Sequence, residues 1–369
     1  MIKILLIAEP GSGGVKRNIL DIIENVEHDT FKLYLVYSKN RADSDYIESL
    51  ESFCKSYSLN IFEISELQRN ISFKKDCISL LKIYNIIKEI KPDVVHCHSS
   101  KAGVLGRIAA KFFGKCKIIY TPHSYIFQNP NLSLIKKKFF ILLEKILTKY
   151  CTNMVINVAN DEFELAQECK LGDKNKFVVI HNGIKVDNNY KRNIKNEKSV
   201  ICITRFDEQK NPYEIIKIAE KIYQKRKDII FYLVGNGIYY VPIKQYVTEE
   251  KIDNIVLTGY SNDVKKFLLK GRVFLSTSLY ESFPYAILEA LSYGIPVVCT
   301  NVIGNREIVK NQQTGWLYNI GDIEKASEII CNIIDEKISI DSQSLIEFIQ
   351  LNYNIKQMIE KLQKIYIEN

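Results

Sequence analysis

The sequence has no pair of cysteines at Cys-x-x-Cys spacing, and its nine cysteines stand singly along 369 residues. An odd number of scattered cysteines argues against both a disulfide framework and a zinc site. No apolar run reaches the roughly 18 residues that a membrane-spanning helix needs. The N-terminal stretch MIKILLIAEP is also too short for a secretory signal peptide. We therefore expect a cytoplasmic protein with reduced thiols and no integral membrane segment.

Acidic residues are rare between His98 and Tyr150, where ten lysines and arginines accompany the single acid Glu144. Such a segment suits an anionic partner, which is a phosphorylated substrate, an acidic lipid surface or a nucleic acid. A solvated basic face is the plainer alternative. Aromatic residues are not regularly interleaved with these cations, and no DNA-reading motif is present, so we expect no binding of nucleic acid.

Apolar residues make up 46% of the chain, and its length predicts two domains. Short β-branched runs alternate with longer amphipathic stretches, which is typical of βαβ units and parallel sheets. The polar stretch 185–198 has no apolar periodicity and is interpreted as the linker. The sequence therefore predicts an α/β protein of two Rossmann-like, doubly wound domains that face each other across a cleft. The predicted domains are residues 1–187 and 188–350, followed by a C-terminal helix, residues 351–369, that would pack back on the first domain.

Eleven apolar runs are predicted to be strands. They are KILLIA, KLYLVYS, DVVHCH, KIIYT, MVINV and FVVI in the first half, and SVICIT, IIFYLVG, NIVLTG, VFLSTS and PVVCT in the second. A single terminal helix is predicted over about 345–368. Ligands of open α/β sheets bind outside the carboxyl ends of the strands, so the loops after these runs are where chemistry is expected.

The first strand run leads into Gly11-Ser12-Gly13-Gly14, before a helix that begins near Val15. Glycines permit a tight turn, and the N–H groups of a helix N-terminus attract an anion. The third glycine of a dinucleotide-binding fingerprint is missing, and the second strand run does not end in an acid. These two departures argue against a nicotinamide cofactor.

Two cations, Arg205 and Lys210, follow the run SVICIT on a loop that enters a helix near Pro212. An arginine fork and a lysine point charge at a strand's carboxyl end can clamp a diphosphate. Without further context, two cations five residues apart are usually ordinary surface charges.

The segment ESFPYAILE joins a loop to a helix. Pro284 fits the first helical position, so Ser282 or Phe283 is expected to cap the helix. The carboxylates of Glu281 and Glu289, at this spacing, suit the hydroxyl groups of a polyol better than a metal, whose ligands must converge on one point. The candidate ligand site of this segment comprises Glu281, Phe283, Pro284, Tyr285 and Glu289.

These motifs occur together in one order, and over nearly the whole chain the sequence resembles the family 4 glycosyltransferases, a retaining family with the GT-B fold. The resemblance implies transfer of a sugar from a nucleotide-sugar donor, with a UDP-sugar favoured, to a glycan or lipid-diphosphate-linked acceptor. Synthesis of bacterial capsule, exopolysaccharide or O-antigen is the implied setting. The stretches that carry the resemblance are KPDVVHCHSSKAGVLGRIAAKFFG, YTPHS, HNGI, ITRFDEQKNP, FYLVGNG, VLTGYSNDV and LYESFPYAILEALSYGIPVVCTNVIGNREIV.

The resemblance assigns roles to the residues of the second domain. Glu281 would hold the hydroxyls of the transferred sugar, and Glu289 would hold the donor ribose. Arg205 and Lys210 would neutralise the diphosphate. Leaving-group charge builds on the diphosphate during transfer, so fixed cations are what speed this step.

The resemblance also assigns three residues of the first domain. Gly13 and Gly14 would approach the donor phosphates. His123, in Thr-Pro-His-Ser, matches the family's active-site histidine beside the sugar. With Glu281, it is the expected catalytic residue, acting by positioning; a purely structural role is the alternative.

No metal and no other cofactor is expected. His96 and His98 end a strand run, so their side chains face one way, and no third ligand is expected near them. Asp43-Ser44-Asp45 copies the Asp-x-Asp of metal-dependent transferases. It follows the second strand run, however, away from the predicted donor domain.

The stretch LSLIKKKFFILLEKILTKY predicts an amphipathic helix, with Lys136, Lys137 and Lys138 at its start. Such a helix can lie in the headgroup plane of anionic lipid, which predicts a peripheral protein on the inner face of the plasma membrane. The alternative is that its apolar face packs on the sheet of its own domain and the lysines are merely solvated.

Two other functions share this architecture. A sugar-nucleotide 2-epimerase would need further acid and base residues facing the sugar, which the sequence does not place. A non-catalytic partner that kept the fold would be expected to lose Glu281, Glu289, Arg205 or Lys210, and all four are present.

Overall fold

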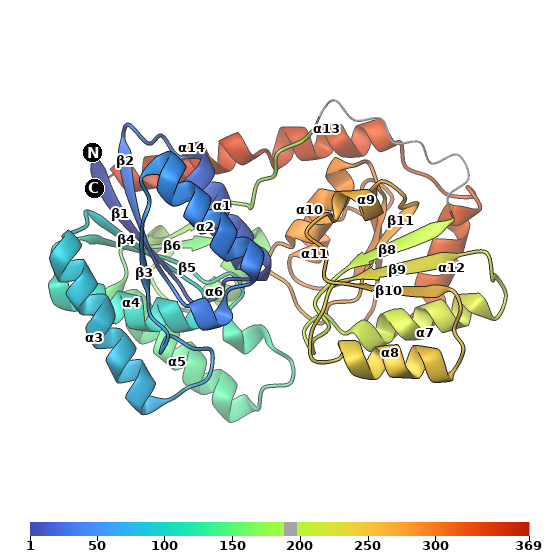
Figure 1. The fold of residues 1–369 in the computed structure, drawn as a ribbon, viewed down its shortest axis with the longest axis horizontal. Helices are drawn as coiled ribbons and strands as arrows, with labels where there is room; N and C mark the ends of the chain where they lie inside the picture. The colour runs from blue at the N-terminus through green and yellow to red at the C-terminus, as the bar shows by residue number, and fades with distance from the viewer. Residues whose placement is uncertain (188–197, 369) are drawn as a thin grey trace. The chain divides into compact units, whose positions relative to one another are not determined.

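The computed structural model describes residues 1–187 and 198–368, which form two compact units (Figure 1). Unit 1 comprises Met1–Gly183 and the C-terminal segment from Ile355, and unit 2 comprises Ile184–Asn354. The chain thus divides after Gly183 and Asn354, where the sequence predicted boundaries after residues 187 and 350. Most of the predicted linker, residues 188–197, lies outside the described residues.

Unit 1 contains a seven-stranded parallel sheet in the order β3-β2-β1-β4-β5-β6-β7. The winding reverses between β1 and β4, and open sheets of this kind bind ligands at that point. The strands are β1 (Ile2–Ala8), β2 (Phe31–Tyr37), β3 (Asn60–Glu63), β4 (Val94–His98), β5 (Lys117–Thr121), β6 (Met154–Asn157) and β7 (Phe177–Val179). The helices are α1 (Gly13–Asn25), α2 (Ser44–Tyr57), α3 (Phe73–Ile90), α4 (Ser100–Phe113), α5 (Leu134–Cys151), α6 (Asn160–Glu168) and α14 (Ile355–Ile367).

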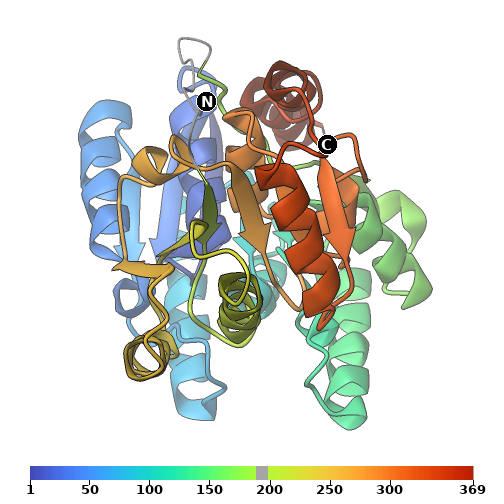
Figure 2. The same cartoon turned by 90° about the vertical axis from the view of Figure 1, so that its right-hand side faces the viewer.

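Unit 2 contains a six-stranded parallel sheet in the order β10-β9-β8-β11-β12-β13, and its winding reverses between β8 and β11. The strands are β8 (Ser199–Ile203), β9 (Ile230–Val234), β10 (Ile255–Gly259), β11 (Val273–Ser276), β12 (Val297–Thr300) and β13 (Gly315–Tyr318). The helices are α7 (Pro212–Tyr223), α8 (Tyr240–Glu249), α9 (Lys265–Leu268), α10 (Tyr285–Ser292), α11 (Asn305–Ile308), α12 (Ile323–Ile334) and α13 (Ser342–Asn352). Figure 2 gives a second view of the strands and the helices that cover them.

Strand β1 shows why a parallel sheet forms in unit 1. Ile4 and Leu6 pack into the apolar layer that contains α1 and α14, whereas Leu5 and Ile7 pack into the layer that contains α3 and α4. Side chains alternate between the two faces of a strand, so a strand covered on both faces reads as a continuous apolar run. This pattern predicted the two doubly wound sheets, which are confirmed.

Two edge strands, β3 and β13, were not predicted. In β3 only Ile61 and Phe62 separate the polar residues Asn60 and Glu63, and β13 begins with Gly315. Because an edge strand has one neighbour and partial cover, it needs a shorter apolar run than a central strand. The single-helix prediction for 345–368 is wrong as well, since α13 and α14 are separate helices.

The helical conformation is interrupted between α13 and α14 at Tyr353. The Tyr353 ring packs against Phe283 and Phe348 in unit 2. This contact holds the last residues of α13 in unit 2, while α14 contributes to the core of unit 1. Among the described residues, no helix is long and apolar enough to cross a membrane. All nine cysteines are free thiols, and burial raises the pKa of Cys97 to about 12.

Candidate functional site

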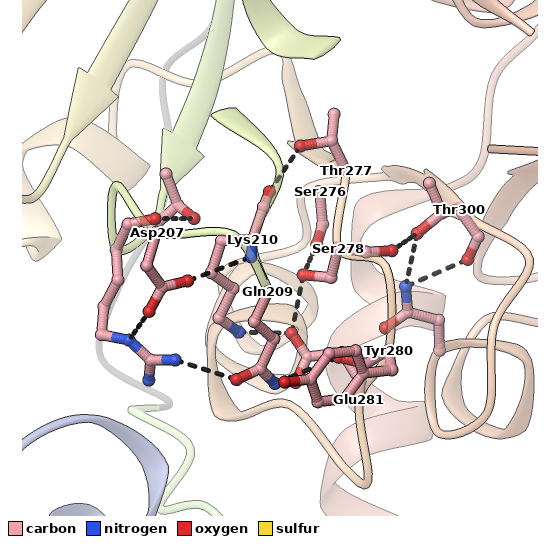
Figure 3. A network of polar contacts seen from close by, with 12 residues as sticks. Asp207, Gln209, Lys210, Ser276, Thr277, Ser278, Tyr280, Glu281 and Thr300 are labelled. Carbon is pink, nitrogen blue, oxygen red and sulfur yellow. Dashed lines mark hydrogen bonds and ion pairs between the residues drawn. The ribbon is translucent and has the colours of Figure 1, made fainter. Parts of the chain in front are cut away.

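The loops that follow β8 and β11 meet at the carboxyl edge of the unit 2 sheet (Figure 3). These strands are neighbours where the winding reverses, which is the usual ligand-binding position of such sheets. The backbone N–H of Leu279 donates to the carbonyl of Gln209 (2.8 Å), and the Thr277 hydroxyl donates to the carbonyl of Lys210 (2.9 Å). The two loops therefore hold each other in place.

Arg205 lies on the β8 loop, and two side chains orient its guanidinium. Nε donates to Oδ2 of Asp207 (2.7 Å), and Nη2 donates to Oε1 of Gln209 (3.0 Å). Gln209 donates in turn to the carbonyl of Tyr280 (3.1 Å), on the loop after β11. The Arg205 side chain is 42% exposed, so an oriented planar cation stands at the sheet edge where solvent can reach it.

Lys210 and Glu281 are 71 positions apart in the sequence, yet Nζ of Lys210 forms an ion pair with Oε1 of Glu281. The same carboxylate oxygen accepts a hydrogen bond from the Ser278 hydroxyl (2.7 Å). The backbone N–H of Lys210 donates to Oδ1 of Asp207 (3.1 Å), so Asp207 supports both cations. The Glu281 side chain is only 8% exposed, and a carboxylate buried this deeply needs such partners.

Helix α10 begins one residue later than predicted. Pro284 precedes the first helical turn with extended backbone (ψ 120°), and the helix starts at Tyr285. The predicted capping by Ser282 or Phe283 is therefore wrong, and Pro284 occupies the capping position without a side-chain hydrogen bond. Gly304, on the loop after β12, packs tightly on this segment, since a Cβ there would lie 2.1 Å from the carbonyl oxygen of Ser282.

The other residues predicted on this segment have different surroundings. The Phe283 ring is buried and packs edge-on against Tyr353, with 5.1 Å between ring centroids, so it anchors the loop in the interior of unit 2. Tyr285 is also buried, and Glu289 is partly buried along α10. Arg205 and Lys210 together are called the two-cation site, and Glu281 contacts it through its ion pair with Lys210.

In unit 1, the glycine segment follows β1 and opens α1. Gly13 is the first helical residue, and its φ of +68° lies in the left-handed region that favours glycine. Gly14 continues the helix, and Ser12 precedes it without a side-chain cap. Sequence reasoning missed the neighbouring Glu9, a buried acid directly after β1. It accepts hydrogen bonds from Nη1 of Arg41 (2.8 Å) and from the Ser99 hydroxyl (2.9 Å), and its position after a buried strand was the available signal.

Asp43 and Asp45 support local structure. Asp43 caps α2 by accepting the backbone N–H of Tyr46 (2.8 Å). Both carboxylates pair with Nζ of Lys16, which lies on α1. These contacts account for the Asp-x-Asp spacing as a link between α1 and α2.

A third histidine, His123, lies beside His98, and the sequence did not predict this neighbour. His123 follows β5, which pairs with β4, and its Nε2 lies 3.0 Å from Nδ1 of His98. The register places Thr121 opposite His98, which brings residue 123 close to the end of β4. Among the described residues, no group of three or more histidine, cysteine, aspartate or glutamate side chains could hold a metal ion.

Helix α5 carries the predicted lysine patch, Lys136, Lys137 and Lys138. Much of its apolar side is exposed, including Leu134 (76%) and Phe139 (57%). The other large exposed apolar residues of α5 are Ile135, Leu142, Ile146 and Tyr150. The helix is fixed from its inner side, where buried Glu144 accepts a hydrogen bond from Nη2 of buried Arg107 (2.8 Å).

Comparison with known proteins gives matches over both units. Residues 12–188 match the family described as Glycosyltransferase Family 4, and residues 185–350 match Glycosyl transferases group 1. The chain is 30% identical to the UDP-Gal:alpha-D-GlcNAc-diphosphoundecaprenol alpha-1,3-galactosyltransferase of Escherichia coli, over 97% of this chain and 95% of that protein. It is 26% identical to the capsular polysaccharide biosynthesis glycosyltransferase CapM of Staphylococcus aureus, over 81% and 82% of the two chains.

The fold is similar to that of HepE from Anabaena, crystallised with UDP and glucose. The TM-score is 0.81 at 19% identity, over 99% of both chains. Together with the two doubly wound sheets, these matches show that the chain belongs to the family 4 glycosyltransferases and has the GT-B fold.

Proposed function

We propose that the chain is a retaining transferase that moves a hexosyl group from a UDP-sugar to a lipid-diphosphate-linked glycan without a metal ion. The observation that supports this most directly is the grouping of Arg205, Lys210 and Glu281 where the unit 2 sheet reverses. Two fixed cations beside a buried carboxylate suit a diphosphate joined to a polyol. The name of the E. coli relative contains both UDP-Gal and diphosphoundecaprenol, which supports this donor and acceptor class and a role in surface polysaccharide synthesis.

The chemistry follows from where charge develops. As the bond between sugar and diphosphate breaks, negative charge grows on the leaving phosphate, and Arg205 and Lys210 stabilise it. Glu281 accepts hydrogen bonds from sugar hydroxyls, Glu289 holds the ribose, and the amides at Gly13 and Gly14 approach the phosphates. The acceptor hydroxyl attacks from the side that the diphosphate leaves, and the leaving phosphate takes its proton. Configuration at the sugar carbon is therefore retained, and His123 positions the sugar without acting as a base.

A panel of nucleotide sugars tests the donor class. We expect UDP and one UDP-sugar to raise the thermal unfolding temperature, since a ligand at 100 times its Kd adds about 2.7 kcal/mol of stability. The stabilising UDP-sugar is then incubated with a synthetic polyprenyl-diphosphate-linked sugar, and the anomeric configuration of the product is read by NMR. Stabilisation by a guanosine or thymidine diphosphate sugar in place of UDP-sugars, or an inverted product, would refute the corresponding part of the proposal.

Replacing Arg205 with Ala is expected to weaken binding of UDP and of the UDP-sugar alike. A charge-assisted hydrogen bond is worth about 1.5–3 kcal/mol, which corresponds to roughly 10- to 150-fold in Kd, measured by titration calorimetry. Arg272→Ala is the matched control, because Arg272 precedes β11 at the amino edge of the same sheet and pairs with Glu336 (2.7 Å). Unchanged UDP affinity in Arg205→Ala would rule out a role in binding the diphosphate.

Sugar transfer is expected to survive removal of divalent metals. In the proposed function Arg205 and Lys210 supply two positive charges to the diphosphate, so a metal would add little. The measurement compares initial rates with an excess of EDTA and after titration with manganese or magnesium. A strict metal requirement would overturn this expectation, and the pairing of Asp43 and Asp45 with Lys16 would then have to break for them to serve as ligands.

The exposed apolar side of α5 supports docking on an anionic membrane, where a lipid-linked acceptor would be met. Leu134, Ile135 and Phe139 are exposed and not covered by the sheet of unit 1. The three lysines Lys136–Lys138 lie directly after Ile135 in the same helix. An amphipathic helix with this composition binds in the headgroup plane, and each lysine near acidic lipid contributes about 1 kcal/mol. The inner face of the plasma membrane is the proposed location.

Flotation with liposomes measures this docking. Binding is expected to rise with anionic lipid content, to fall with salt and to be largely lost when Lys136, Lys137 and Lys138 are changed to Gln. Changing the exposed unit 2 lysines Lys225, Lys227 and Lys244 to Gln removes the same charge and should leave binding intact. Equal losses of binding in both triple variants would mean that net charge, and not the position of the lysines on α5, causes the binding. A protein that does not bind even strongly anionic vesicles would refute membrane docking.

A further inference from the structure

Three histidines meet at the carboxyl edge of the unit 1 sheet. His96 and His98 lie on the same face of β4, and their ring centroids are 3.9 Å apart. His96 is held on both sides, with Nδ1 2.8 Å from the Tyr366 hydroxyl and Nε2 2.8 Å from Oγ1 of Thr121. His98 contacts His123 through Nδ1 and Nε2, 3.0 Å apart. The cluster thus runs from a fixed buried ring to the proposed active-site histidine.

The backbone of His123 is also held from its other side. His123 and Ser124 have φ values of +52° and +93°, which are uncommon for residues other than glycine. The carboxylate of the fully buried Glu162 accepts hydrogen bonds from the backbone N–H of Ser124 (2.8 Å) and of Val158 (2.9 Å). The buried acid therefore holds the backbone of this turn, and the contact between Nε2 of His123 and Nδ1 of His98 orients the ring.

All three rings are neutral at ordinary pH. Burial lowers the pKa of His96 and of His123 to about 3, and it lowers the pKa of His98 well below its usual value. A neutral imidazole has one N–H and one lone pair, so in the contact between His98 and His123 one ring donates and the other accepts. If His98 donates, the proton of His123 is on Nδ1; if His123 donates, its proton is on Nε2.

The surroundings of His98 distinguish these arrangements. Within the described part of the chain, Nε2 of His98 is buried and has no hydrogen-bond partner. A proton on Nε2 would be a buried, unpaired N–H, which is rarer in proteins than an unpaired acceptor. The proton of His98 therefore belongs on Nδ1, where it makes the hydrogen bond to Nε2 of His123.

We propose that His98 is a positioning residue that fixes His123 as the tautomer with its proton on Nδ1. His123 then presents a neutral N–H donor to the substrate, and its Nε2 lone pair is already occupied. It cannot take the proton of the attacking hydroxyl, which agrees with transfer of that proton to the leaving phosphate. This use of the ring rests on the proposed function, whereas the tautomer itself does not.

Histidine side-chain 15N NMR reads the tautomer directly, without substrate. The chain has five histidines, and a His123→Asn variant identifies the His123 signals. We expect a protonated Nδ1 and an unprotonated Nε2 for His123 in the wild-type protein. A protonated Nε2 would overturn the proposal, whether or not the chain transfers sugar.

Two variants of similar size separate positioning from packing. His98→Asn places an amide N–H near the position of Nδ1 and should keep both the tautomer of His123 and most of kcat. His98→Gln places its amide near Nε2, so we expect a mixture of His123 tautomers and a roughly tenfold lower kcat, with the KM for donor within about twofold. Both are compared at temperatures well below their measured unfolding. Identical spectra and rates in the two variants would refute the positioning role.

Discussion

Replacing Glu281 with Gln is expected to lower kcat roughly 10- to 150-fold and to leave the affinity for free UDP within about threefold. The charged carboxylate accepts hydrogen bonds from the transferred sugar in the proposed function, and a charge-assisted hydrogen bond is worth about 1.5–3 kcal/mol. UDP has no transferred sugar, so it should not report the loss. Steady-state kinetics gives kcat, and titration calorimetry gives the Kd for UDP.

The structure adds a reason why UDP affinity should be preserved in this variant. Nζ of Lys210 is paired with Glu281, and Gln removes the negative charge that competes with the diphosphate for this lysine. Loss of the Glu281 charge therefore weakens the contacts with the sugar, while Lys210 stays available to bind phosphate. Ser278→Ala is a milder comparison, because it deletes only the hydroxyl that donates to Glu281 (2.7 Å). Its kcat should fall less than that of Glu281→Gln.

Glu289→Gln provides the contrasting variant. If Glu289 holds the ribose, its loss should weaken UDP itself, with the donor and UDP affected to the same extent. The division of roles between the two acids fails if both variants lose UDP affinity equally. It also fails if Glu281→Gln loses UDP affinity and Glu289→Gln does not.

The two-cation site was largely predictable, because the topology of a parallel sheet brings the carboxyl ends of its strands to one edge. Arg205 and Glu281 follow buried runs that became β8 and β11, and neighbouring parallel strands bring their carboxyl ends together. The ion pair between Lys210 and Glu281 was not predictable, since it depends on the course of both loops. Asp207 and Ser278 gave no signal, because an acid and a serine in polar loops are common.

The histidine cluster shows a different limit. Strand periodicity placed His96 and His98 on one face, but the sequence alone did not give the register of β4 against β5. That register sets Thr121 opposite His98, and the left-handed turn at His123 then brings its ring back to β4. The edge strands β3 and β13 were missed for a related reason, since their burial comes from neighbours rather than from their own short apolar runs.

Unit 1 is expected to lose stability as the pH falls from 7.5 to 5. The folded pKa of His96, about 3, lies below its unfolded value near 6.5, so only the unfolded chain gains this proton over that range. The contribution of neutral His96 to the free energy of unfolding is therefore fully present above about pH 7 and declines as the pH falls below about 6.5. His96 alone contributes a loss of about 2 kcal/mol at pH 5, at 1.36 kcal/mol per unit. The lowered pKa values of His98 and His123 act with the same sign.

Because all the histidines lie in unit 1, unit 2 serves as an internal control for the loss of stability at low pH. All five histidines, the last of them His181, lie in unit 1, and the single tryptophan, Trp316, lies in unit 2. Amide hydrogen exchange of peptides from β1 and β4 should therefore accelerate between pH 7.5 and 5, after correction for intrinsic rates, far more than exchange around Trp316. A His96→Gln variant, less stable at pH 7.5, should show a pH dependence smaller by about 2 kcal/mol, because the titrating group is gone. An unchanged pH dependence in that variant would mean that His96 is not held neutral in the folded protein.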